Sequence, residues 1–396
     1  MNRLPTLRQF RLWCAAALLA LLVTVTACNR NRSLELENVF AYVSNGKSDS
    51  VSVIDVSRMA VVRTIGVGRN PSGIAASPTR NELYVVNTES NNVSVIDAVK
   101  NTVIATIGVQ RAPYWIDVSA DGKRGYVANS GSDNVSVIDL DTRTVLANVR
   151  VGSSPGLARV SPDGKTIVVS NRADNSVSVI DASPIQYRAT LSVCQEPQDI
   201  VILPDSTKAF VACPASSQVA AVDLKQAKLL ALLDVGKTPI HLALKPDGGE
   251  LFVSNFESSS VSAIETTANE VGGTYLMGDK PVRGVVTSDN TLLYVAAFGS
   301  DAVSVFSINE GRLIGSVQVG RRPDAIALTP AENFLLVADS SSGDVAVVRL
   351  TQMPRGSKIS IAERFLKGQN PSKDRALVTM IPVGVAPNSI AIKIVK

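Results

Sequence analysis

The stretch VGRNPSGIAASPTRNELYVVNTESNNVSVIDAVKNTVIATIGV, residues 67–109, holds four short runs rich in β-branched residues. Clusters of Gly, Pro, Asn, Asp and Ser separate the runs, as is typical of β-strands joined by tight turns. Its second run begins with Tyr-Val-x-Asn at Tyr84, and its third is Val-Ser-Val-Ile-Asp from Val93. The stretch therefore predicts four antiparallel strands, which we name A to D in chain order.

The same pattern recurs eight times at an interval of 42 residues. The first half starts at Tyr42, Tyr84, Tyr126, Ile167 (one residue early), Phe210, Phe252, Tyr294 and Leu336. The second half starts at Val51, Val93, Val135, Val177, Val219, Val261, Val303 and Val345. A fixed period of about 40 residues that contains only strands predicts an all-β fold, a β-propeller with one four-stranded blade per repeat.

The two ends of the repeated region predict how the ring closes. The region begins at a B strand, residues 40–45, and ends at 388–395 with the signature of an A strand. We therefore expect the C-terminal strand to complete the first blade. The 358 residues from 39 to 396 hold eight repeats of 42 and a surplus of 22, which predicts eight blades. Seven blades with one displaced repeat is the alternative.

The surplus is an insert at 354–374, between strands C and D of the last blade. Apolar residues at helical spacing, followed by stop signals, predict a short amphipathic helix there. The residues are Ile361, Ala362, Phe365 and Leu366, then Gly368 and Pro371. We expect this predicted helix either to bind a partner or to cover the end of its own blade.

Together with turns such as Ser-Pro-Asp-Gly-Lys at 161–165, these motifs resemble the YVTN family of β-propeller repeat proteins. The resemblance covers residues 39–396. It implies an exported bacterial protein of the cell surface or periplasm, and it brings no catalytic motif with it. Many members of that family are seven-bladed, so the eighth repeat is a departure.

The first 28 residues have the features of an export signal. A basic start is followed by an apolar run, 12–25, that is too short to span a membrane. The run ends in Val-Thr-Ala-Cys at 25–28, which resembles a bacterial lipobox and implies cleavage before Cys28 and lipidation of its thiol. An ordinary secretory signal with a chance cysteine is the alternative. We expect a signal peptide at 1–27, a lipidated tether at 28–38 and the propeller at 39–396.

Asn29 stands where Asp would retain a bacterial lipoprotein at the inner membrane, which predicts the outer membrane, facing the periplasm or the cell surface. The signal carries three basic residues and no acidic ones, so its loss lowers the formal charge from +4 to +1. A near-neutral chain gives no electrostatic reason to bind nucleic acid. We expect a monomer whose partners are the membrane and either envelope proteins or a small polar ligand.

Residues that recur in every blade are interpreted as structural. One acid ends each successive C strand: Asp55, Asp97, Asp139, Asp181, Asp223 and Glu265. Acids on separate blades cannot converge on one ion, and Asp bonds backbone N–H groups in turns, so no metal site and no cofactor is predicted. The Asn residues at 45, 87, 129, 171 and 255 are expected to satisfy the backbone of the turn between strands B and C.

Two cysteines break the repeat within one blade. Cys194 takes the place of a Gly found at 68, 152, 236, 278 and 320, and Cys213 takes the place of the Asn. Both replacements lie toward the same end of one A–B hairpin. Because an exported protein meets an oxidising compartment, we predict a Cys194–Cys213 disulfide. Two isolated small residues are the alternative.

The A strands carry a second break. Their third and fifth residues after Pro are apolar, so the second and fourth residues are expected to face the central channel. Charged and aromatic residues occupy these positions in five consecutive blades: Trp115, Asp117, Arg159, Asp199, His241 and Arg283. These residues form a ligand site at the channel mouth, or they pair with one another in a water-filled channel.

A non-enzymatic binding or scaffold module at the cell envelope accounts for these features, because no nucleophile or metal-ligand set is evident. The alternative is a propeller enzyme of lactone hydrolase or lyase type. In that enzyme Asp199 orients His241 as general base, and Arg283 or Arg159 holds developing negative charge. A redox-accessory protein that binds haem through His241 is a third possibility, although no Cys-x-x-Cys-His motif exists.

Overall fold

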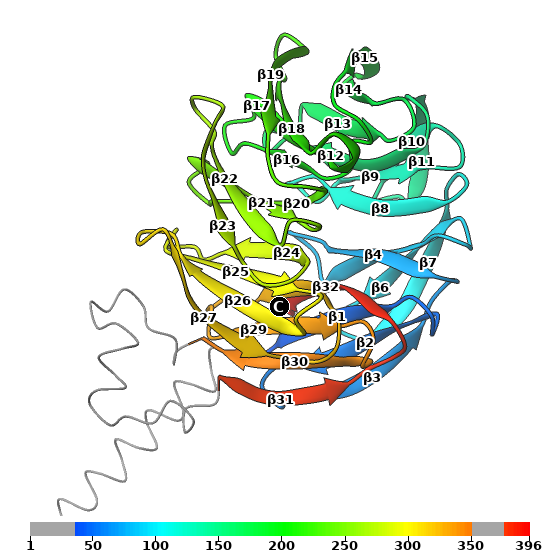
Figure 1. The fold of residues 1–396 in the computed structure, drawn as a ribbon. Helices are drawn as coiled ribbons and strands as arrows, with labels where there is room; N and C mark the ends of the chain where they lie inside the picture. The colour runs from blue at the N-terminus through cyan, green and yellow to red at the C-terminus, as the bar shows by residue number, and fades with distance from the viewer. Residues whose placement is uncertain (1–35, 351–375) are drawn as a thin grey trace, which may run out of the picture.

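The computed structural model describes residues 36–350 and 376–396, which form a ring of eight four-stranded antiparallel sheets (Figure 1). The prediction of eight blades is confirmed, and the seven-bladed alternative is wrong. The predicted signal peptide, most of the tether and the insert at 354–374 lie outside the described residues. Among the described residues, no helix is long and apolar enough to cross a membrane.

We number the blades I to VIII around the ring, and each is given from strand A to strand D. Blade I holds β32 (Pro387–Ile394), β1 (Val39–Asn45), β2 (Ser50–Asp55) and β3 (Ala60–Gly66). Blade II holds β4 (Pro71–Ala76), β5 (Glu82–Asn87), β6 (Asn92–Asp97) and β7 (Thr102–Gly108). Blade III holds β8 (Pro113–Val118), β9 (Arg124–Asn129), β10 (Asn134–Asp139) and β11 (Thr144–Arg150). Blade IV holds β12 (Pro155–Val160), β13 (Thr166–Asn171), β14 (Ser176–Ala182) and β15 (Ile185–Ser192).

The second half of the ring repeats this order. Blade V holds β16 (Ile200–Ile202), β17 (Lys208–Cys213), β18 (Gln218–Asp223) and β19 (Lys228–Asp234), with the short 3-10 helix η1 (Pro214–Ser216) after β17. Blade VI holds β20 (Pro239–Leu244), β21 (Glu250–Asn255), β22 (Ser260–Glu265) and β23 (Glu270–Leu276). Blade VII holds β24 (Pro281–Val286), β25 (Leu292–Ala297), β26 (Ala302–Ser307) and β27 (Arg312–Gln318). Blade VIII holds β28 (Pro323–Leu328), β29 (Phe334–Asp339), β30 (Asp344–Arg349) and β31 (Leu377–Pro382).

The ring closes through strand pairing between its two ends. The last strand, β32, pairs antiparallel with β1, and Val39 stands opposite Ile394. Figure 1 shows this red strand beside the blue one. The predicted closure is confirmed, and β32 covers the edge of β1 that would otherwise be unpaired.

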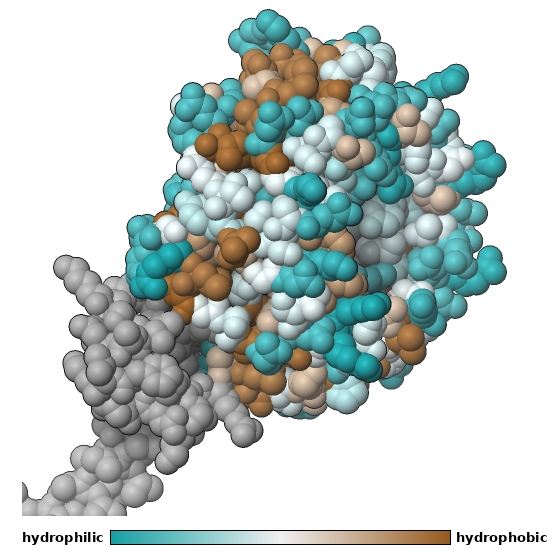
Figure 2. Space-filling model, in the orientation of Figure 1, coloured by the Kyte–Doolittle hydropathy of each residue, from teal (hydrophilic) through white to brown (hydrophobic). Residues whose placement is uncertain are grey.

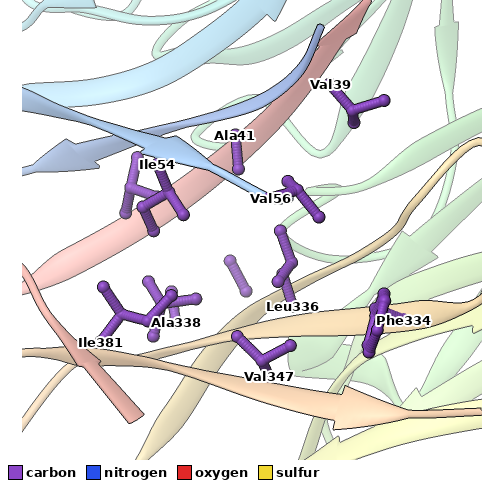
Figure 3. Close-up of a cluster of buried hydrophobic side chains, with 12 residues drawn as sticks. Val39, Ala41, Ile54, Val56, Phe334, Leu336, Ala338, Val347 and Ile381 are labelled. Atoms are coloured by element: carbon purple, nitrogen blue, oxygen red, sulfur yellow. The ribbon is translucent and has the colours of Figure 1, made fainter. Parts of the chain in front are cut away.

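The hydrophobic core consists of clusters between neighbouring blades. Each of the eight blade–blade interfaces in the described part holds one cluster of buried side chains. Figure 3 shows the cluster that joins the ends of the chain, where Val39 and Ile54 of blade I face Leu336 and Val347 of blade VIII. Strands B and C are apolar on both faces because each blade packs against two others, and each such side chain contributes about 1.5–3 kcal/mol.

The A strands form the inner ring and the D strands form the outer edge. Single exposed apolar side chains mark the outer strands, among them Val62, Ile104 and Leu146. In Figure 2 the apolar surface of the visible side is divided into separate brown patches by teal and white residues. We call the end of the ring with the B–C turns and the first residues of the A strands the mouth face. The end with the C–D turns is the rear face.

Asp55, Asp97, Asp139 and Asp223 serve the turns, as expected, whereas Asp181 forms an ion pair with Arg188. The carboxylate of Asp97 accepts hydrogen bonds from the backbone N–H groups of Val99, at 2.8 Å, and Lys100, at 3.0 Å. Asp55 and Asp139 make the same pair of bonds in their own blades. These carboxylates therefore have a local, structural use.

The recurring asparagines do not bind the turn backbone, so that expectation is wrong. In each of the five blades the side-chain Nδ2 donates instead to a serine hydroxyl of strand C; Asn129, for example, donates to Ser136 at 2.9 Å. A glycine of the D–A connection packs on the same side chain. A Cβ on Gly68 would lie 2.7 Å from the Cβ of Asn87, so this position has no room for a larger residue.

Blade V replaces this contact with a covalent bond. The structure joins Cys194 and Cys213 by a disulfide, with Cα atoms 5.7 Å apart, within the usual range for such a bond. Both cysteines belong to the apolar cluster between blades IV and V. The glycine and asparagine positions touch in the other blades, which explains why two cysteines at these positions can bond.

Blade VIII replaces the asparagine with a fully buried acid, Asp339. Both of its carboxylate oxygens and one oxygen of Asp344 are buried and form no hydrogen bond of good geometry with the described residues. Burial, then the adjacent Asp344 carboxyl group, raises the pKa of Asp339 to about 8, while the N–H groups of Gly320 and Ala346 oppose the shift. The two acids therefore share a proton near neutral pH.

Candidate functional site

Three of the predicted inner-ring side chains, those of Asp117, Asp199 and His241, contact the backbone of the next blade, which the simple alternation that we expected did not predict. The carboxylate of Asp117 in blade III accepts the backbone N–H of Val160 in blade IV at 2.9 Å. The carboxylate of Asp199 in blade V accepts the N–H of Leu242 in blade VI at 3.0 Å. The inner strands other than β16 carry a bulge at or just after their proline, and bulges re-aim side chains.

A pocket of about 80 Å³ opens among these residues in blades III to VII. It is lined by Tyr114, Trp115, Gly156, Leu157, Arg159, Arg172, Gln198, Asp199, Ile240 and Arg283. The first residues of the A strands and a B–C turn residue supply much of this lining, so the pocket lies toward the mouth face. The volume is enough for a few water molecules or one small polar group.

An aromatic wall forms one side of the pocket. The guanidinium carbon of Arg159 lies 5.4 Å from the ring centre of Trp115, and that of Arg172 lies 5.9 Å from the ring centre of Tyr114. A Cβ on Gly73 of blade II would come within 2.8 Å of the indole, so this glycine makes room for Trp115. The indole Nε1 is buried and finds no acceptor among the described residues.

A carboxylate–imidazole pair lies at the base of the pocket. Nδ1 of His241 is 2.7 Å from Oδ2 of Asp199, and its Nε2 is 3.1 Å from the backbone oxygen of Gly284. Both partners are hydrogen-bond acceptors, so each ring nitrogen of His241 is directed at an oxygen atom. Burial acts to raise the pKa of Asp199, which is 5% exposed, but His241 first, then Arg159 and Arg283, hold its pKa below the usual range.

The three pocket arginines differ in their partners. Arg159 is 3.6 Å from a carboxylate oxygen of Asp117 and 3.9 Å from one of Asp199. Arg172 and Arg283 form no ion pair and no side-chain hydrogen bond with the residues that the structure describes. Both are half-buried, so two guanidinium groups are partly removed from water without an ion pair, and Arg172 has only the ring of Tyr114 beside it.

The structure brings together four of the six predicted residues as pocket lining: Trp115, Arg159, Asp199 and Arg283. It places Asp117 behind Arg159 and His241 behind Asp199, outside the lining. The sequence interpretation missed Tyr114 and Arg172. Arg172 could have been recognised from the sequence as a break in the repeat. It follows Asn171, and the equivalent position in other blades holds small residues such as Gly46, Thr88 and Ser130.

The site has the donors for recognising an anion rather than the ligands for a metal. Within residues 36–350 and 376–396, no three His, Cys, Asp or Glu side chains are placed to hold a metal ion. The pocket instead presents arginine and indole N–H groups beside the apolar side chains of Leu157 and Ile240. Fold and site together define a closed β-propeller with a small polar pocket between its inner strands.

The profile of the "YNCE-like beta-propeller" family matches residues 34–160 and 125–313, and the chain belongs to this family. The resemblance of its repeats to a propeller repeat family is thereby confirmed. The profile of the "Lactonase, 7-bladed beta-propeller" family matches residues 284–369. No curated protein matches the chain significantly.

Several solved structures share the fold. The dihydro-heme d1 dehydrogenase NirN, in complex with DHE, has a TM-score of 0.73 and 13% identity, covering 90% of this chain and 75% of its own. The hydrazine synthase of Kuenenia stuttgartiensis has a TM-score of 0.59 and 22% identity, covering 71% and 95%. A protein of Bacteroides fragilis proposed to be a 6-phosphogluconolactonase has a TM-score of 0.57 and 16% identity, covering 73% and 97%. These likenesses show the fold alone.

Proposed function

We propose that the protein is an exported, membrane-anchored propeller that acts as a non-enzymatic binding module of the cell envelope. The observation that carries this proposal is the pocket, which holds two unpaired guanidinium groups but no free base. His241 has both ring nitrogens directed at acceptors, so neither is available to take a proton from a substrate. Binding, rather than turnover, is what this arrangement supports best.

The position of the N-terminus supports a definite orientation at the membrane. The backbone N–H of Val39 donates to the carbonyl of Leu36, and the carbonyl of Val39 accepts the N–H of Val56. Because Val56 begins a C–D turn, Leu36 lies at the rear face. A lipid on Cys28 would hold this face toward the bilayer through a tether of about ten residues, which spans roughly 35 Å at most. The pocket on the mouth face would then point away from the membrane, open to the periplasm or the cell surface.

The anchor is tested with Cys28→Ala in intact cells. We expect this variant to leave the membrane fraction and to lack the acyl mass on its mature N-terminus. Cys14→Ala is the matched control, because position 14 lies in the predicted signal peptide and outside the predicted lipobox. If Cys28→Ala stays in the outer-membrane fraction with an unchanged N-terminal mass, the anchoring proposal is wrong.

A propeller enzyme of lactone hydrolase or lyase type is the second candidate, favoured by the family match at 284–369. Asp199 and His241 would be its orienting pair, and Arg159 or Arg283 would hold negative charge. This candidate requires His241 Nε2 to leave the carbonyl of Gly284, to which it is 3.1 Å away. A redox-accessory protein would likewise need this nitrogen as a haem ligand.

One preparation separates these functions. After signal cleavage Trp115 is the only tryptophan, so its emission reports directly on the pocket. We expect saturable ligand binding without turnover, and pull-down of envelope proteins if the ring surface is also used. Turnover of a lactone that His241→Ala abolishes, with the fold intact by circular dichroism, would establish the enzyme instead.

A further inference from the structure

We infer that the pocket takes a small oxyanion, a carboxylate or a phosphate group, as its ligand. This inference rests on the proposed binding function and names its ligand class. Its first support is the pair Arg172 and Arg283, which approach one pocket from blades IV and VII. Half-buried guanidinium groups normally find a carboxylate or phosphate partner, because desolvation of the charge is otherwise uncompensated.

The acidic residue in the pocket does not oppose such a ligand. Asp199 is the only acid in the lining, and Nδ1 of His241 lies 2.7 Å from its carboxylate oxygen Oδ2. The backbone N–H groups of Ile200 and Leu242 also donate to this carboxylate, each at 3.0 Å. Its oxygens are therefore used within the fold, and the adjacent arginines are not committed to it by close ion pairs.

Two other acids near the pocket, Asp117 and Asp324, form no ion pair with Arg172 or Arg283. Asp117 lies behind Arg159 and accepts the N–H of Val160. Asp324 interacts electrostatically with Arg283 but forms no ion pair with it, and burial raises the pKa of Asp324. Arg283 therefore keeps donors for a ligand.

The neutral lining sets the size and shape of the ligand. The indole Nε1 of Trp115 is a buried donor without an acceptor, so one ligand oxygen can satisfy it. Leu157 and Ile240 offer an apolar wall for a short carbon segment. A pocket of about 80 Å³ admits one oxyanion group and little more, so the rest of a larger ligand would extend from the mouth face.

The test uses the mature protein and the emission of Trp115. Inorganic phosphate and acetate are the two oxyanion probes, and glycerol and tetramethylammonium chloride are the neutral and cationic ones, all at constant ionic strength. We expect saturable binding of at least one oxyanion only, weakened about 10- to 100-fold by Arg283→Gln or Arg172→Gln. Arg322→Gln is the matched control, since this arginine stacks on Phe298 at 5.5 Å outside the pocket.

The outcomes separate the ligand class from the binding function. If neither oxyanion binds, or if both pocket variants bind as the parent protein does, the oxyanion assignment is wrong. Saturable binding of only the neutral or cationic probe overturns the oxyanion class and leaves the binding module standing. Turnover that depends on His241 overturns the binding module itself.

Discussion

Blades V and VIII replace the asparagine that five other blades share, and they do so in opposite ways; blade VII has Ala297 at this position. Where five blades use the amide of an asparagine, blade V has Cys213 in a disulfide and blade VIII has Asp339 beside Asp344. The disulfide of blade V is covalent and independent of pH. The contact between Asp339 and Asp344 needs a proton on one carboxyl group, whereas in the five asparagine blades the amide N–H groups act as donors at any pH. The comparison shows that a propeller interface can accept different chemistry at one position.

The largest expected effect comes from breaking the blade V contact. The double variant Cys194→Gly/Cys213→Asn restores the residues of the repeat and removes the disulfide. Because the bond closes a loop across a sequence separation of 19, we expect the free energy of unfolding to fall by about 3 kcal/mol. Urea denaturation with and without reductant measures this. The parent protein should lose stability with reductant and the variant should not; equal stabilities throughout would contradict the prediction.

The next effect concerns the blade VIII pair and its pH dependence. With the pKa of Asp339 near 8, the folded protein retains a proton that an unfolded aspartate releases above about pH 4. Stability from this group is therefore present at low pH and is lost as the pH rises to about 8. Asp339→Asn should abolish this loss. Between pH 6 and pH 9 the free energy of unfolding of the variant, relative to that of the parent protein, should rise by about 2 kcal/mol.

Denaturation curves of the parent and Asp339→Asn proteins across this pH range test the pair. The difference between them should increase up to about pH 8 and then level off. A constant difference at all pH values would mean that Asp339 and Asp344 do not share a proton in the folded state.

The smallest effect is expected in an ordinary blade. Asn129→Ala removes the donor to Asn134, at 2.8 Å, and to Ser136, at 2.9 Å, in blade III. We expect a loss of about 1–2 kcal/mol that is the same at pH 6 and pH 9, since no acid is involved. A pH-dependent loss here would remove the contrast with blade VIII.

Much of the candidate site followed from breaks in the repeat. Trp115, Arg159, Asp199 and Arg283 line the pocket, and the sequence singled them out because equivalent positions in other blades are small and apolar. The predicted contact between His241 and Asp199 is confirmed, but His241 lies behind Asp199 rather than in the lining. Strand alternation says which residues share a face, but not that a bulged inner strand directs its side chains toward the next blade.

The sequence by itself determined the number of blades, the closing strand and the cysteine pair, because each depends on a fixed spacing along the chain. Only the tertiary structure decided that Arg172 joins the pocket, that the carbonyl of Gly284 contacts His241 and that the carboxyl groups of Asp339 and Asp344 are buried next to each other. Repeat spacing places strands within a blade, whereas these contacts depend on side-chain rotamers across blade interfaces or within a buried turn. The packing of the whole ring selects those rotamers.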